Sequence, residues 1–136
     1  MGMFKNFKEC SEFHFSLIYW AELYKVYHMT LYSFFTPVPA VLAQLVFPSK
    51  TRSGMRVQAT CLVQEGDQPF SFMWKKDGNQ LRTGNDFRIS QLDVFTSILV
   101  IEKASADHSG NYTCEVTNPA TTSVTSSALN VRGDYT

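Results

Sequence analysis

The thiols of Cys10, Cys61 and Cys114 carry the most distinctive chemistry in this chain, because two of them can be oxidised to a disulfide bond. Trp74 lies between Cys61 and Cys114, nearer to the first. This order and spacing are typical of a β-sandwich in which a disulfide joins the facing sheets and the tryptophan packs against it. We therefore predict a Cys61–Cys114 disulfide and an unpaired thiol at Cys10. The disulfide favours a secreted or cell-surface domain, with a reduced pair in an intracellular sandwich as the alternative.

A second cluster, Asp107 and His108 between Ser105 and Ser109, has the residue types of a hydrolase. Nucleophilic catalysis also needs a base oriented by a third group and a site that stabilises an oxyanion. A tight surface corner of the predicted sandwich offers neither, so we predict that the protein is not an enzyme. The spacing of a zinc site and a glycine-rich phosphate loop are both missing from the sequence, so we expect no metal, cofactor or small-molecule substrate.

Short strands would position these residues. From Val57 to Val63 every second residue is apolar, which is the period of a half-buried strand. Turn residues at Gly66–Pro69 and at Asp77–Asn79 separate this segment from further strands of the same kind. A first edge strand is expected over Val41–Phe47, closed by a proline. Further residues expected in the core or at the corner before the second cysteine are Trp74, Leu99, Asp107, Gly110 and Tyr112.

The pattern predicts an all-β fold, an immunoglobulin-like β-sandwich of two antiparallel sheets and of the intermediate set. Tyr112 fits this fold because it lies two residues before Cys114, where a tyrosine hydroxyl ties a corner of such sandwiches. We assign residues 38–132 to this domain and residues 133–136 to a linker stub.

Residues 1–37 form an N-terminal extension that is rich in aromatic residues. Charged residues interrupt its apolar stretch, so it fits neither an ordinary signal peptide nor a membrane span. Apolar residues recur at helical spacing from Phe13 to Leu31, which would suit an amphipathic helix. Three interpretations stay open: a degenerate signal sequence, an amphipathic or disordered segment, and a spurious start upstream of a single exon.

The surface charges and motifs point to protein contact. Lysine and arginine number 12, as do aspartate and glutamate, so no basic field would attract nucleic acid. We predict an ion pair between Arg88 and Asp107, the alternative being that both are solvated. Asn111 begins an N-glycosylation sequon and should face outwards. The sequence Arg132-Gly133-Asp134 matches the tripeptide that integrins read, although a chance match is the favoured interpretation.

The domain resembles an immunoglobulin domain of the arthropod Down syndrome cell adhesion molecule (Dscam) family. The resemblance is carried by Phe47-Pro48, Gly54-Met55-Arg56, Gly66-Asp67-Gln68-Pro69 and the stretch from Leu99 to Asn118, and it covers about Val38 to Arg132. It implies homophilic cell recognition, as in neuronal self-recognition and axon guidance, by a glycoprotein at the cell surface. Membrane association would then come only through a missing part of a longer protein. A secreted domain of immune recognition and a spacer module of a larger receptor are the alternatives.

In that family the self-binding face of the variable domains is commonly the sheet of the first, second, fourth and fifth strands. Antiparallel self-pairing of Arg56 with Glu102 would make such a contact complementary in charge. An ordinary solvated sheet face is the alternative. By strand phase the outward residues of this sheet are Arg56, Gln58, Thr60, Arg88, Ser90, Val100 and Glu102.

Overall fold

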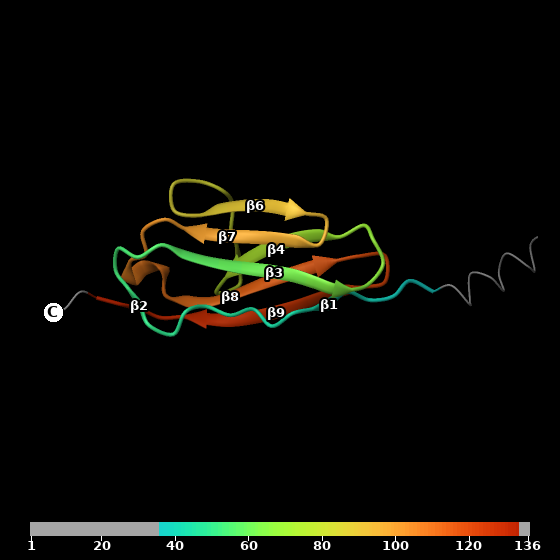
Figure 1. Cartoon of the computed structure of the whole chain (residues 1–136), viewed down its shortest axis with the longest axis horizontal. Coiled ribbons are helices and arrows are strands. Elements are labelled where there is room, and N and C mark those ends of the chain that lie inside the picture. The colour runs from blue at the N-terminus through green and yellow to red at the C-terminus, as the bar shows by residue number, and fades with distance from the viewer. Residues whose placement is uncertain (1–35, 134–136) are drawn as a thin grey trace, which may run out of the picture. The chain divides into compact units, whose positions relative to one another are not determined.

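The computed structural model of the chain describes residues 36–133, and the N-terminal extension, including Cys10, lies almost entirely outside them. Residues 37–133 lie in one compact unit, Pro37–Thr136 (Figure 1). Its elements are β1 (Val41–Leu42), β2 (Thr51–Arg52), β3 (Val57–Glu65), β4 (Ser71–Lys76), β5 (Asn79–Gln80), β6 (Arg88–Asp93), β7 (Thr96–Ile101), the 3₁₀ turn η1 (Ala106–His108), β8 (Gly110–Thr117), β9 (Thr122–Leu129) and β10 (Val131–Arg132).

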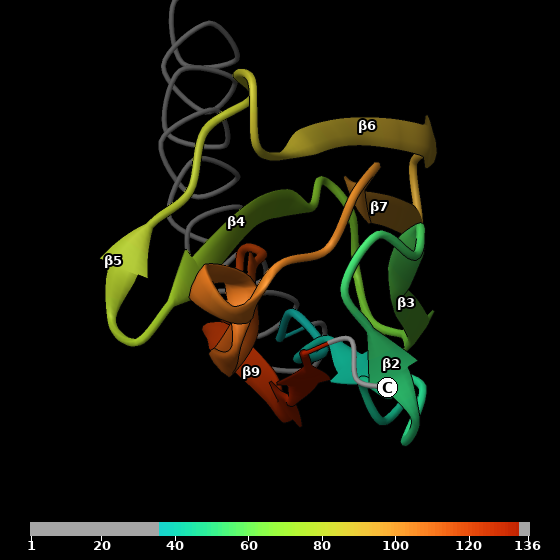
Figure 2. The ribbon, with the colours of Figure 1, turned by 90° about the vertical axis from the view of Figure 1, so that its left-hand side faces the viewer.

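Two antiparallel four-stranded sheets pack face to face. One has the strand order β1-β3-β7-β6 and the other β5-β4-β8-β9. Figure 2 shows them as two layers, with β6, β7 and β3 in one and β5, β4 and β9 in the other. A short parallel ladder between β2 and β10 closes one side of the sandwich. The predicted fold class, an immunoglobulin-like sandwich of the intermediate set, is confirmed.

Alternation of apolar and polar residues builds the core between the sheets. Along β3, the residues Val57, Ala59, Cys61 and Val63 are buried and those between them are exposed. The same two-residue period places Tyr112 and Cys114 inwards on β8. Because each sheet has one apolar face, packing these two faces together removes the apolar side chains of the strands from water. The buried core is made of Ala40, Leu45, Phe47, Val57, Ala59, Cys61, Val63, Trp74, Leu99, Ile101, Ala104, Tyr112, Cys114, Val116, Leu129 and Val131.

The first strand is shorter than predicted. The ladder with β3 covers Val41–Leu42 and is followed by one hydrogen bond from the Ala43 N–H to the Leu62 carbonyl at 2.9 Å, after which the chain crosses to the edge of the other sheet. There the Leu45 N–H donates to the Thr125 hydroxyl at 2.9 Å, and the Gln44 carboxamide donates to the Ser126 carbonyl at 3.0 Å. The first strand therefore contributes to both sheets, which alternation alone does not reveal.

The turn between β4 and β5 is a tight hairpin, as the Asp77-Gly78 dipeptide predicts. Both residues have positive φ, 49° at Asp77 and 87° at Gly78. Two consecutive residues with positive φ are what a type I′ hairpin requires. The turn brings the Asp77 carboxylate to the start of β8, where it becomes part of the corner described below.

Candidate protein-binding faces and the corner that supports them

The predicted disulfide is present. Cys61 on β3 and Cys114 on β8 are joined by a sulfur–sulfur bond of 2.08 Å, and their Cα atoms are 6.3 Å apart. Trp74 is 1% exposed, and its indole N–H donates to the Ser97 hydroxyl at 2.9 Å. The bridge therefore joins the two sheets, and a buried polar contact fixes the tryptophan between them.

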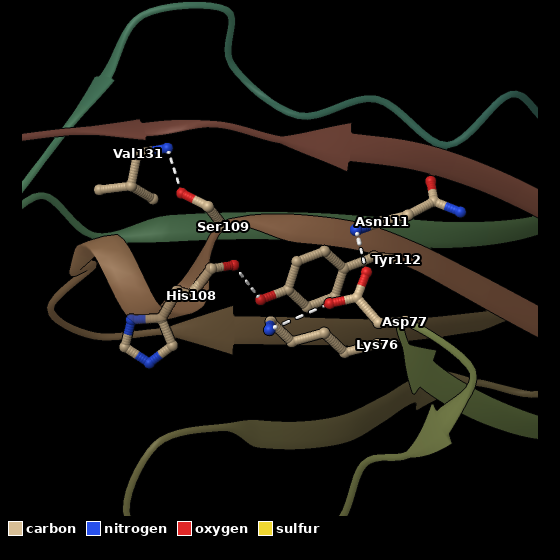
Figure 3. A network of polar contacts seen from close by, with 7 residues as sticks. All are labelled: Lys76, Asp77, His108, Ser109, Asn111, Tyr112 and Val131. Carbon is tan, nitrogen blue, oxygen red and sulfur yellow. Dashed lines mark hydrogen bonds and ion pairs between the residues drawn. The ribbon is translucent and has the colours of Figure 1, made fainter.

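A tyrosine corner holds the end of the sandwich where η1 enters β8 (Figure 3). The Tyr112 hydroxyl donates to the His108 carbonyl at 2.5 Å. Burial, and secondly the negative charge of Asp77, raises the pKa of the Tyr112 phenol. The ring is wholly buried and packs on Phe47, with 5.0 Å between ring centroids. The corner thus combines a buried hydrogen bond with aromatic packing, as predicted for Tyr112.

The Asp77 carboxylate connects the hairpin turn to β8 by a hydrogen bond. It accepts the Asn111 N–H at 2.9 Å and lies 3.3 Å from the Lys76 ammonium. These two contacts, the first being the larger, lower the pKa of the Asp77 carboxyl. Gly110 leaves room for this carboxylate, since a Cβ there would lie 2.6 Å from its nearer oxygen. The glycine predicted as part of the corner is therefore needed for a close approach.

The predicted ion pair between Arg88 and Asp107 is wrong. Asp107 is exposed on η1, and no ion pair joins it to any residue between 36 and 133. The next residue, His108, points inwards instead and packs edge-on against Phe87, with 5.4 Å between ring centroids. Arg88 pairs with Glu102 at 2.5 Å. The 3₁₀ turn gives the inward direction to the histidine, so the aspartate cannot reach the arginine.

The residues of the apparent hydrolase cluster form structural contacts. The His108 Nδ1 atom accepts the Ser105 N–H at 2.9 Å and lies 3.2 Å from the Ser105 hydroxyl. Its Nε2 atom lies 3.9 Å from an Asp86 carboxylate oxygen, and the Ser109 hydroxyl accepts the Val131 N–H at 2.9 Å. A ring nitrogen that already accepts a main-chain N–H is not free to take a proton from a serine. The cluster caps the turn and ties it to β10.

The outer face of the β1-β3-β7-β6 sheet holds the residues predicted for self-binding. Six of the seven are exposed, namely Arg56, Gln58, Thr60, Arg88, Ser90 and Glu102. Val100 is the exception, being only 4% exposed. It lies in register between Gln58 and Arg88, whose longer side chains flank it on both sides. Strand phase gave the direction of Val100 correctly, but its neighbours remove it from the accessible surface.

Glu102 is the centre of a charged network on this face. Its two carboxylate oxygens lie 3.3 Å from Arg56 Nε and 2.5 Å from an Arg88 guanidinium nitrogen. The Arg56 guanidinium also donates to the Gln58 carboxamide at 3.1 Å. The pair of Arg56 with Glu102 that was expected between two copies is thus made within one chain. Any contact between copies through these residues has to share or exchange these partners.

The outer face of the opposite sheet has a different character, which we did not predict from the sequence. Lys75 on β4 and Glu115 on β8 pair at 2.6 Å. Exposed Met73 and Val124 flank Glu115 on either side in the strand register. Alternation and residue type together could have placed Met73 and Val124 on an outer face, but their position on either side of Glu115 depends on the strand register, which alternation does not give.

A hollow at one end of the sandwich is lined by Pro69, Phe70, Ser71, Thr117, Asn118 and Pro119. None of these side chains titrates, so they offer no general acid or base. Within residues 36–133 no group of histidine, cysteine and carboxylate side chains is arranged to hold a metal ion. No helix in this part of the chain is long and apolar enough to span a membrane.

The tripeptide Arg132-Gly133-Asp134 begins inside β10. The Arg132 carbonyl accepts the Ser53 N–H at 2.9 Å, so its main chain is fixed in the ladder with β2. Asp134 lies outside the described residues. The ladder holds the Arg132 main chain and leaves its side chain exposed, and the chance match of this tripeptide stays a prediction.

Comparison with known proteins agrees with this architecture. Residues 43–118 match the family model described as immunoglobulin domain. The chain is 39% identical over 83 residues to the cell adhesion molecule Dscam2 of Drosophila melanogaster, covering 61% of this chain and 4% of that protein. It is 38% identical over 95 residues to the cell adhesion molecule DSCAM of Rattus norvegicus, covering 70% of this chain and 5% of the relative.

The chain therefore spans only a small part of the length of these relatives. Among solved structures, the Dscam1 Ig7 domain, isoform 5, superimposes with a TM-score of 0.67 at 31% identity, over 70% of this chain and 98% of that domain. Insect and rat relatives match alike, so the similarity extends beyond arthropods. The chain belongs to the immunoglobulin domain family, and it is similar to the domains of Dscam cell adhesion molecules.

Proposed function

We propose that this domain acts in cell adhesion by binding an identical domain on an opposing cell, as in neuronal self-recognition. The similarity to Dscam adhesion molecules supports a role in adhesion. The Cys61–Cys114 disulfide supports an extracellular location, because such bonds persist in oxidising compartments. The binding partner is a protein, and the outer face of the β1-β3-β7-β6 sheet makes the contact.

The observation that carries this proposal is the charged network around Glu102. A two-fold contact needs a patch that is complementary to itself, with residue i of one copy meeting residue j of the other. Glu102 and its two arginines place both signs of charge side by side on one face. When two such patches meet across a two-fold axis, an arginine of each copy can exchange its partner for the other copy's carboxylate.

The size of the face limits the affinity. The four strands of this sheet hold 2, 9, 6 and 6 residues. At about 3.3 Å per residue and about 4.8 Å between strands they present roughly 360 Å² of projected area. A standard interface buries about 800 Å² on each partner. The half-exposed ion pairs contribute about 0–1 kcal/mol each, so they select the partner more than they tighten the contact. We expect a weak dimer of the isolated domain, with a Kd between about 0.01 and 1 mM.

Sedimentation equilibrium of residues 37–136, secreted with the disulfide formed, tests the proposal over a concentration range that reaches the millimolar region. Glu102→Arg should abolish the dimer, because it leaves three arginines in the patch. Glu115→Arg, on the opposite sheet, is the matched control and should leave the dimer unchanged. A monomer at every concentration would refute self-recognition by this domain and favour a spacer or a receptor for another partner.

A mixing experiment separates contacts between copies from the ion pairs within one chain. The Glu102→Arg variant and a double variant, Arg56→Glu with Arg88→Glu, should each be monomeric. Mixed together they should form a heterodimer, since the positive patch of one meets the negative patch of the other. The charge control is an equal mixture of Glu102→Arg with a variant that carries Glu102→Arg together with Lys50→Glu, Lys75→Glu and Arg82→Glu, which have the same changes of net charge as the test pair but a positive patch on both partners. Association in that control as well would show attraction of opposite net charges and not recognition by this face.

A further inference from the structure

Asn111 is the acceptor residue of the only N-glycosylation sequon in the chain, Asn111-Tyr112-Thr113. The strand phase of β8 turns Tyr112 into the core and leaves the Asn111 side chain exposed on the outer face of the sheet. In Figure 3 its carboxamide points away from the Asp77 carboxylate and from the Tyr112 ring. Within residues 36–133 only the main chain of Asn111 makes hydrogen bonds, its N–H donating to the Asp77 carboxylate and its carbonyl accepting the Asp77 N–H.

The surroundings leave space for a large substituent. The residue directly opposite Asn111 on β9 is Ala128, which is small and exposed. On its other side the chain turns through the exposed Asp77-Gly78 hairpin. A group attached to the carboxamide nitrogen would therefore break no hydrogen bond within residues 36–133, and it would extend from an exposed side chain.

We propose that Asn111 carries an N-linked glycan that covers the outer face of the β5-β4-β8-β9 sheet. The donor is a lipid-linked diphosphate oligosaccharide. A bond forms between the Asn111 Nδ2 atom and the anomeric carbon of the first N-acetylglucosamine, while the bond from that carbon to the diphosphate oxygen breaks. The lipid diphosphate leaves, and the carboxamide loses one proton to a base of the transferase. Nothing is oxidised or reduced in this step.

The fold fixes when the transfer has to happen. In the folded domain β8 is paired on both sides, with β4 and with β9. The Thr113 hydroxyl, which the transferase must recognise, makes a hydrogen bond of 2.8 Å with the Ser126 hydroxyl. A strand held in this way cannot enter an active site as an extended peptide. The glycan is therefore added before β8 pairs, and the finished fold tolerates it because the carboxamide faces solvent.

The consequence is an asymmetry between the two outer faces. The glycan lies on the sheet that carries Met73, Lys75 and Val124, and it removes that sheet from contact with proteins. The Glu102 network lies on the opposite sheet and stays bare. This inference does not depend on self-recognition, because glycan attachment is measured without any binding partner.

The test is to secrete the full chain from animal cells behind a supplied signal peptide and to measure its intact mass before and after peptide:N-glycosidase treatment. We expect a mass above that of the polypeptide, lost on treatment, with an aspartate left at position 111. Asn111→Gln and Thr113→Ala should abolish the added mass. Thr113→Ser is the matched control and should retain it, since it keeps the hydroxyl. A secreted wild-type chain with the bare polypeptide mass would overturn the proposal.

Coverage of the sheet has its own measurement. Lys75 is in register with Thr113, next to the sequon, whereas Lys103 is exposed and follows the other sheet. A bulky amine-reactive ester should modify Lys75 several-fold more slowly in the glycosylated wild type than in Asn111→Gln. Lys103 should react equally in both proteins. Equal rates at Lys75 would contradict coverage of this face, while the mass measurement would still decide attachment.

Discussion

Removing the Tyr112 hydroxyl should destabilise the domain without changing its fold. Tyr112→Phe keeps the ring, which packs on Phe47 and Phe87 in the core. It deletes the donor of the hydrogen bond to the His108 carbonyl. The change therefore isolates one buried polar contact at the corner that carries β8.

The size of the effect follows from burial. A typical hydrogen bond contributes about 0.5–1.5 kcal/mol net, and a buried group left without its partner costs about 1–3 kcal/mol. Since the Tyr112 side chain is fully buried, we expect the free energy of unfolding to fall by about 2 kcal/mol. With a urea dependence of about 1–1.5 kcal/mol per M, the midpoint should fall by about 1.3–2 M.

Urea unfolding of residues 37–136, followed by the fluorescence of Trp74, measures this shift. Trp74 is the only tryptophan in that part of the chain. Thr117→Val is the control, because it removes one hydroxyl of an exposed pair, 2.8 Å from Thr122. It should change stability by less than about 0.5 kcal/mol. A loss below about 0.5 kcal/mol in Tyr112→Phe would refute our account of the corner.

Alkaline pH gives an independent check of the same contact. The pKa of Tyr112 is raised in the folded domain above its unfolded value of about 10. Above pH 10 the unfolded chain therefore loses a proton that the folded domain retains. Stability should fall there by up to about 1.4 kcal/mol per pH unit in the wild type. This part of the decline should be missing in Tyr112→Phe, and identical alkaline curves would contradict the assigned burial.

Three further changes probe other parts of the domain. Gly66→Ala should lower the free energy of unfolding by more than about 2 kcal/mol, because it adds positive-φ strain and a Cβ that would lie 2.7 Å from a main-chain carbon. Gly54→Ala has the same kind of strain but meets nothing within 4 Å, so it should cost only about 1–2 kcal/mol. The urea midpoints of the two variants compare these losses. Cys114→Ala removes the disulfide that closes a loop of 53 residues, so the free energy of unfolding should fall by about 4 kcal/mol and the domain should unfold near body temperature. A thermal melt like that of the wild type would contradict this stabilising role of the disulfide. The lowered pKa of Asp77 contributes stability that is present above the unfolded pKa of about 3.9 and is lost as the pH falls through the folded value. In Asp77→Asn this contribution is absent. Acid titration of the variant should therefore show a smaller loss of stability below about pH 4 than the wild type shows.

The core and the corner could be predicted from the sequence because their geometry is local or repeated. Alternation with a period of two assigns the inward residues of a strand, and the positions of Cys61, Trp74 and Cys114 place three of them on facing sheets. Tyr112 follows, since it shares the phase of Cys114 on the same strand. These features depend on strand phase alone, which the residue pattern fixes.

The errors concern features that phase does not fix. Val100 has the outward phase of its strand, but its exposure depends on the length of side chains on the two neighbouring strands. The direction of Asp107 depends on how a 3₁₀ turn of three residues is wound. One residue of rotation in that turn exchanges Asp107 for His108 at the inward position, and no periodicity in so short a segment distinguishes the two.

The arrangement of Glu102 between two arginines also determines how the proposed contact would select its partner. Each carboxylate is already satisfied within its own chain, so a matched partner adds little attraction beyond the exchange of equivalent ion pairs. A partner that lacks the carboxylate behaves differently, because its arginines would face those of this chain without a counter-charge. Like charges brought together and partly desolvated are costly. Discrimination would therefore come mainly from repulsion of mismatched domains. A contact of this kind can have a low affinity in the isolated domain and still distinguish a matched partner from a mismatched one.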